Sequence, residues 1–104
     1  MSARDSFPSL FQFLSGYFHQ DWVDDSDDPD VIVKNFVDDS SRADLSGVRT
    51  DLNRILNIER TDAQLRALLA ELGCSVEYSA FGKTAREWLS DVRALLTKLA
   101  DAKR

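Results

Sequence analysis

The sequence predicts an all-α protein, a compact single-domain bundle of about five helices. Apolar residues recur at spacings of three and four in five separate stretches, which is the period of an amphipathic helix. Helix-start signals precede most of these stretches, and the connections between them are short. Because 104 residues is a usual length for one domain, we expect residues 1–104 to share one core.

The first expected helix covers about residues 8–18. Pro8 suits the first position of a helix, and Ser6 is the candidate cap before it. Six apolar side chains recur along this segment at helical spacing: Leu10, Phe11, Phe13, Leu14, Tyr17 and Phe18. Aromatic rings bury large areas, so this helix should contribute heavily to the core.

The second expected helix covers about residues 29–38. Asp28 suits its capping position, because the carboxylate can accept a hydrogen bond from an unpaired backbone N–H. Acidic residues at a helix start also interact favourably with the helix dipole. Asp28 and Asp30 therefore have a structural interpretation beside any functional one. The apolar residues expected to face inward are Val31, Ile32, Phe36 and Val37.

Three further helices complete the expected bundle. The third covers about residues 42–57 and begins with a capping box at Ser41. The fourth begins with a capping box at Thr61 and stops at Gly73, a residue that favours a left-handed helix end. The fifth begins with a capping box at Thr84 and continues to about residue 100.

The connection at residues 74–82 has no helical pattern, and an extended piece within it would have no partner strand. We expect a loop with Val76, Tyr78 and Phe81 partly buried. Cys74 is the single cysteine, so no intrachain disulfide can form. The N-terminus has no apolar signal segment, and no apolar run has the length of a membrane span. These features predict a soluble cytoplasmic protein.

Negative charge is concentrated in the first half of the chain. Residues 1–45 carry ten aspartates against three basic residues, whereas residues 46–104 carry eight acidic and ten basic residues. Six carboxylates fall within ten residues with no base between them: Asp21, Asp24, Asp25, Asp27, Asp28 and Asp30. Such a stretch repels itself, which indicates a cationic partner. The overall acidity argues against direct binding of nucleic acid.

The aspartate-rich stretch does not fit a calcium-binding loop. An EF-hand loop requires oxygen ligands at its positions 1, 3 and 5, glycine at position 6 and glutamate at position 12. Counted from Asp24, the chain has Pro29 in place of the glycine and Asn35 in place of the glutamate. We therefore expect no metal site and no cofactor.

His19 is the only histidine of the chain. With Asp21 two residues further on, it could form a general-base pair, but a lone histidine beside two aromatics is more often a packed or hydrogen-bonded structural residue. The sequence has no second histidine for zinc, no nucleophile elbow and no glycine-rich phosphate loop. We expect no catalytic residue and no enzymatic activity.

Residues 7–22 and the acidic stretch after them resemble the immunity proteins of contact-dependent growth inhibition systems. Residues 17–22 read YFHQDW, which is similar to a sequence near the N-terminus of the small helical CdiI family. The likeness is specific over residues 7–37 and looser beyond. It implies a cytoplasmic antitoxin that forms a heterodimer with the C-terminal toxin domain of a CdiA effector. Toxins of these systems are often nucleases, tRNases among them.

An inhibitor that covers the basic cleft of a nuclease needs carboxylates on a stable scaffold. The candidate partner-binding residues are accordingly Asp21, Trp22, Asp24, Asp25, Asp27, Asp28, Asp30, Asp38 and Asp39. Trp22 could instead close the core beneath the first helix. Asp51 and Arg49, expected to be exposed on the third helix, could equally form the interface.

Two other functions remain open from the sequence. The acidic stretch could belong to a regulatory module that binds another basic protein, with no toxin involved. An enzyme that uses His19 is the third interpretation. In none of these do we expect direct contact with nucleic acid or with a membrane.

Overall fold

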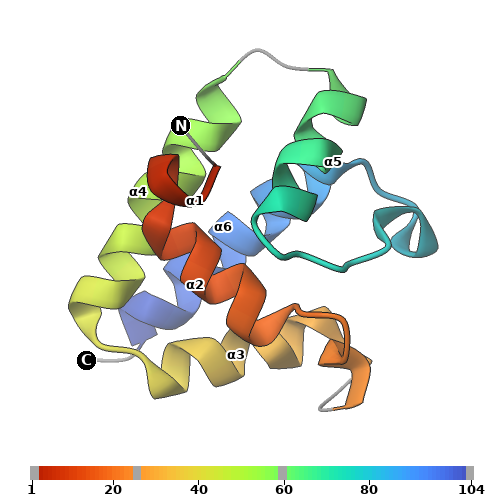
Figure 1. The fold of residues 1–104 in the computed structure, drawn as a ribbon. Helices are drawn as coiled ribbons and strands as arrows, with labels where there is room; N and C mark the ends of the chain where they lie inside the picture. The colour runs from red at the N-terminus through yellow and green to blue at the C-terminus, as the bar shows by residue number, and fades with distance from the viewer. Residues whose placement is uncertain (1–2, 25–26, 59–60, 103–104) are drawn as a thin grey trace.

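The computed structural model describes residues 3–24, 27–58 and 61–102, and Figure 1 shows their arrangement. These residues form α-helices and short 3-10 turns, and no strand occurs among them. Their helices are α1 (Ala3–Ser6), α2 (Pro8–Tyr17), α3 (Pro29–Asp39), α4 (Arg42–Asn57), α5 (Asp62–Glu71) and α6 (Ala85–Ala102). The predicted all-α fold is confirmed, and the short helix α1 is an addition that the sequence pattern did not predict.

Helix α6 is the centre of the packing. It contacts α3, α4 and α5, and in Figure 1 it passes behind α2, which crosses the front of the molecule. Helix α2 in turn packs on α3 and α4. The largest fully buried side chains of the shared core are Leu10, Phe13, Leu14, Phe18, Ile32, Leu52, Ile55, Leu65, Leu69, Leu72, Leu89 and Leu96. Within the described ranges, we find no helix with the length and apolar character of a membrane span.

Local signals set most of the helix starts, as predicted. The Asp28 carboxylate accepts a hydrogen bond from the N–H of Asp30 at 3.0 Å and caps α3. Reciprocal capping boxes precede α4, α5 and α6, and they begin at Ser41, Thr61 and Thr84. Each box satisfies backbone N–H groups that a helix start leaves unpaired.

The start of α2 is capped from another helix. The sequence predicts Ser6 as its cap, which is wrong, because Ser6 ends α1 and Phe7 before α2 has no side-chain acceptor. Asp51 of α4 takes this role. Its Oδ2 accepts hydrogen bonds from the N–H groups of Ser9 and Leu10, both at 3.0 Å. The cap therefore joins two helices that are about 40 residues apart in the chain.

Asp51 is consequently buried, with 5% of its surface exposed, and the expectation that it is exposed is wrong. The start of α2 covers it. Arg54 balances its charge, with Nη1 at 3.4 Å from Oδ1, and the same Nη1 donates to the carbonyl of Ser6 at 2.7 Å. Asp51 thus serves the fold and is not available to a partner.

The buried side of helix α3 differs from the predicted one by a single exchange, Val33 in place of Val31. Ile32, Phe36 and Val37 are buried as expected, but Val31 is 42% exposed and Val33 is buried. A helix turns by about 100° per residue, so two residues that are two positions apart cannot both face the core. The four-residue spacings of Ile32 with Phe36 and of Val33 with Val37 define the buried side.

The chain after α5 passes close to α2. Gly73 ends α5 with φ at 81°, as predicted, and a Cβ there would lie 2.8 Å from Cβ of Ser15. In the loop that follows, Val76 and Tyr78 are buried, and Phe81 is 37% exposed. Glycine at this position therefore allows both the left-handed turn and the close approach to α2.

Candidate protein-binding face

The acidic stretch lies at the surface between α2 and α3. Its described carboxylates are all exposed: Asp21, Asp24, Asp27, Asp28 and Asp30. Asp25 lies outside the described residues. A 3-10 turn, Trp22–Asp24, carries the chain away from α2 toward the start of α3. The exposure of these five carboxylates leaves them accessible to a partner, and their contact with a partner stays a prediction.

Helix α3 extends this negative surface. Asp30, Lys34 and Asp38 follow one another at four-residue spacing on its solvent side, and Asp39 is exposed as well. The rise from Asp28 to Asp39 is about 16 Å. One partner can cover both ends, since a standard interface buries about 800 Å² of each protein. We call this surface the acidic face; it consists of Asp21, Asp24, Asp27, Asp28, Asp30, Asp38 and Asp39.

Lys34 does little to offset the charge of the acidic face. Between residues 21 and 39 the sequence has eight aspartates and this single lysine. Nζ of Lys34 lies 3.8 Å from Oδ2 of Asp38, and both side chains are more than half exposed. An exposed pair of this kind contributes little to stability, and the acidic face keeps a strongly negative net charge.

The aromatic residues of segment 17–22 connect the acidic face to the core. Phe18 is fully buried, and its ring centroid lies 5.2 Å from that of Trp88 on α6. Trp22 packs on Phe18 at 5.5 Å and is only 6% exposed. Of the two alternatives for Trp22, burial favours a place in the core, whereas its contact with a partner stays a prediction.

Two polar side chains of the same segment, His19 and Tyr17, form hydrogen bonds with residues at the two ends of the acidic face. Nδ1 of His19 accepts a hydrogen bond from the N–H of Asp21 at 3.1 Å, which fixes the turn into the acidic stretch. The Tyr17 hydroxyl donates to Oδ2 of Asp39 at 3.0 Å. Partial burial raises the pKa of Tyr17, and the hydrogen bond to Asp39 raises it further, so the phenol stays a donor. His19 is therefore a hydrogen-bonded structural residue.

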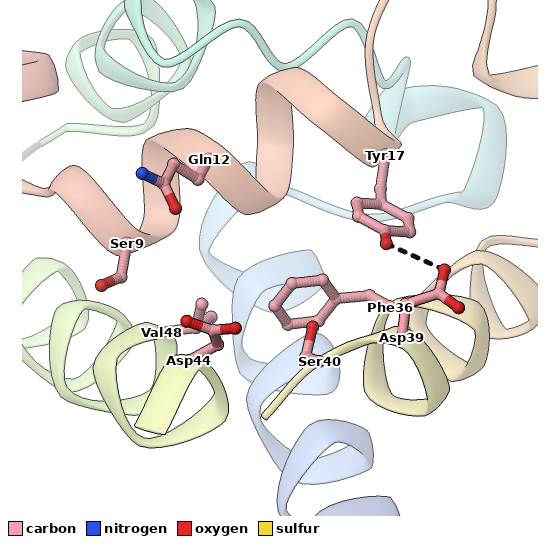
Figure 2. A pocket seen from close by; sticks show the side chains of 8 residues that line it. All are labelled: Ser9, Gln12, Tyr17, Phe36, Asp39, Ser40, Asp44 and Val48. Atoms are coloured by element: carbon pink, nitrogen blue, oxygen red, sulfur yellow. Dashed lines mark hydrogen bonds between the residues drawn. The ribbon is translucent and has the colours of Figure 1, made fainter. Parts of the chain in front are cut away.

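An open cavity of about 260 Å³ lies where α2, the end of α3 and the start of α4 meet (Figure 2). Its lining residues are Ser9, Gln12, Tyr17, Phe36, Asp39, Ser40, Asp44 and Val48. Figure 2 shows the hydrogen bond between Tyr17 and Asp39 at one side of it. Asp44 accepts a hydrogen bond from the N–H of Ser41 in the capping box. Both carboxylates thus have structural partners, and the cavity continues the acidic face toward α4.

A second cavity, of about 280 Å³, lies at the other end of α3 against α6. Its lining residues are Asp28, Pro29, Asp30, Val33, Phe81, Lys83, Trp88, Asp91 and Val92. The large apolar side chains that are exposed among the described residues are Val23, Val31 and Phe81. Val23 lies within the acidic stretch, Val31 follows it directly, and Phe81 shares the cavity with two of its carboxylates. An apolar component thus borders the acidic face.

Sequence reasoning missed this second cavity. It combines residues from α3, the loop before α6 and α6 itself, and no local pattern relates these segments. The sequence predicts that Phe81 is partly buried, and its position in a loop does not indicate that it would line one cavity with Asp28 and Asp30. The available signal was the crowding of carboxylates at the start of α3, because a dense negative charge indicates where a cationic group can bind.

The described residues contain no group of three His, Cys, Asp or Glu side chains that could hold a metal ion. The Cys74 thiol lies 3.5 Å from the hydroxyl of Tyr78, which donates to it. Burial raises the pKa of Cys74, and burial likewise raises the pKa of Tyr78. A protonated thiol is a poor nucleophile, so this pair does not have the properties of a catalytic site.

Comparison with known proteins identifies the family. Residues 6–96 match the sequence model of a family described as CdiI immunity protein. Among solved structures, a chain of the CdiA-CT/CdiI complex from Y. kristensenii 33638 is similar to this one, with a TM-score of 0.79 and 22% sequence identity over 88% of this chain and 98% of that chain. At this identity the likeness shows the fold alone, and curated proteins gave no match. Since the family match spans most of the sequence, the chain belongs to the CdiI immunity protein family.

Proposed function

We propose that this immunity protein binds the C-terminal toxin domain of a CdiA effector and neutralises it in the cytoplasm as a heterodimer. We further propose that the toxin is a nuclease, for example a tRNase, and that the acidic face covers its basic active site. Family membership supports the toxin as the partner, and a CdiA-CT/CdiI complex is known for a protein of similar fold. The acidic face is the observation that supports a nuclease.

Charge complementarity is the physical basis of this proposal. A nuclease must hold phosphates, so the side chains around its active site are largely basic. The acidic face presents seven exposed carboxylates, and Lys34 is the only base between residues 21 and 39. Complementary potentials steer two proteins together and raise the association rate. Rapid capture suits an antitoxin, because the toxin then turns over little substrate before it is blocked.

The helical scaffold keeps the acidic face ordered before binding. Asp28 is engaged in the cap of α3, and Asp39 accepts the hydrogen bond of Tyr17. His19 holds the backbone of Asp21. Groups that are already ordered lose less conformational entropy when a partner binds. A regulatory module for another basic protein would use the same face, and family membership favours the toxin over that alternative.

The test is inhibition of the cognate toxin. The purified CdiA C-terminal domain is incubated with tRNA, with other RNA and with DNA, in the presence and absence of this protein. We expect cleavage of at least one of these nucleic acids, and loss of cleavage when the two proteins are equimolar. A toxin that binds this protein but cleaves no nucleic acid contradicts the nuclease proposal. A complex that still cleaves contradicts the block at the active site.

A further inference from the structure

The cavity between the start of α3 and α6 combines an apolar interior with a negative rim. Val33, Trp88 and Val92 line it and are almost completely buried, so they form its interior wall. The partly exposed ring of Phe81 lines it nearer the surface. A partner side chain that enters this cavity would release water from apolar surface, which favours binding.

Three carboxylates line the same cavity: Asp28, Asp30 and Asp91. The base among its lining residues is Lys83, whose Nζ forms an ion pair with Oδ2 of Asp91. The hydrogen bond to Asp91 raises the pKa of Lys83, and the charges of Asp91, Asp30 and Glu87 raise it further. The cavity therefore attracts positive charge. Within the protein itself, Lys83 already forms an ion pair at its rim.

We propose that this cavity receives an arginine side chain of the toxin domain. The inference rests on the proposed function and adds one defined contact to it. A guanidinium group is planar, stacks on aromatic rings such as that of Phe81, and offers several N–H donors to carboxylates. The apolar stem of arginine suits the interior wall, and its charge suits the rim.

Continuity with the acidic face supports this occupant. Asp28 and Asp30 belong to both the face and the cavity, and Val31 beside them is exposed. Binding energy in protein interfaces concentrates in a few pockets filled by arginine or aromatic side chains, and weaker contacts around them exclude water. Here the cavity would be such a pocket, and the rest of the acidic face would surround it.

Lys83 gives the proposal a directional consequence. In the free protein the ammonium group of Lys83 forms an ion pair with the Asp91 carboxylate. An incoming guanidinium must therefore compete with Lys83 for Asp91. Lys83→Gln should therefore strengthen toxin binding by about fivefold, the scale of releasing one exposed ion pair. Lys98→Gln is the matched control, because Lys98 is an exposed lysine on α6 that does not line the cavity. Its effect should stay below about twofold.

Two further substitutions test the rim and the aromatic wall. Asp91→Asn should weaken toxin binding by about tenfold, because the guanidinium loses a charged acceptor. Asp101→Asn, an exposed carboxylate further along α6, is the control with the same change in net charge. Phe81→Ala should also weaken binding by about tenfold, since aromatic anchors carry much of the energy of an interface. Thermal unfolding of each variant shows whether it is folded.

Titration calorimetry with the cognate toxin domain decides among the outcomes. If the wild-type protein does not bind the toxin, the proposed function is wrong and the inference is wrong with it. If it binds, but Lys83→Gln behaves like Lys98→Gln or Asp91→Asn behaves like Asp101→Asn, the cavity is not the contact. Double-mutant cycles between Asp91→Asn and Arg→Gln or Lys→Gln variants of the toxin should show coupling of about fivefold at one arginine. Coupling to a lysine, or to no residue, contradicts the proposal that the cavity receives an arginine side chain.

Discussion

At the scale of single residues, the buried carboxylate of Asp51 links α4 to the start of α2. Asp51→Ala leaves the N–H groups of Ser9 and Leu10 without their acceptor. We expect the free energy of unfolding to fall by about 3 kcal/mol, because buried donors then lose their partner. Asp51→Asn keeps one acceptor oxygen and should lose less. Urea unfolding measures both variants, and an alanine variant as stable as wild type contradicts this role.

The burial of Trp22 predicts an effect on stability. Trp22→Ala removes a ring that is 6% exposed and packs on Phe18, so the free energy of unfolding should fall by about 3–5 kcal/mol. The neighbouring Val23 is 54% exposed, and Val23→Ala should change stability by less than about 0.5 kcal/mol. The melting temperatures of the Trp22→Ala and Val23→Ala variants, measured by thermal unfolding, test this difference. A Trp22→Ala protein with the wild-type melting temperature but weakened toxin binding would make Trp22 an interface anchor after all.

The raised pKa of the Cys74 thiol predicts a loss of stability at alkaline pH. Burial raises this pKa in the folded state, so the folded protein holds the proton more tightly than the unfolded chain does. The stability that the protonated thiol contributes is fully present below the pKa of the thiol in the unfolded chain, about 8.5. This contribution is lost as the pH rises above that value. Cys74→Ala should show a smaller loss between pH 7 and 9.5 in urea unfolding. The same loss in both proteins contradicts the assignment to this thiol.

At the scale of the elements, alanine variants at two glycines distinguish the cost of backbone strain from the cost of steric overlap. Gly73 and Gly82 both have positive φ, so alanine at either position should cost about 1 kcal/mol of conformational strain. At Gly82 no atom lies within 4 Å of the added Cβ, whereas at Gly73 it meets Ser15 of α2 at 2.8 Å. Gly73→Ala should therefore be less stable than Gly82→Ala by about 1–3 kcal/mol. Equal losses in chemical unfolding would show that α2 moves aside without penalty.

The helices also show which features a sequence can reveal. The starts at Asp28, Ser41 and Thr61 were predictable, because each cap acts within three residues of chain. The burial of Asp51 and the exposure of Val31 were not, because they depend on which side of a helix another helix covers. The acidic stretch could be recognised from its charge, whereas its junction with Phe81 and α6 arises only in the folded chain.

At the scale of the whole molecule, the central claim is that the acidic face steers the protein to its toxin. A matched pair of variants isolates this effect. One variant neutralises three exposed carboxylates of the face with Asp21→Asn, Asp24→Asn and Asp27→Asn. The other neutralises three exposed carboxylates elsewhere with Glu71→Gln, Glu77→Gln and Asp101→Asn. Both change the net charge by the same amount, and neither removes a capping residue of a helix.

The most direct measurement is the rate of association with the toxin domain as a function of salt concentration. We expect the variant of the acidic face to associate about tenfold more slowly at low salt and to lose much of its salt dependence, because steering depends on local complementary charge. The control variant should associate at nearly the wild-type rate, and both should keep the wild-type melting temperature. Equal rates for the two variants at low salt would contradict the role of the acidic face in binding.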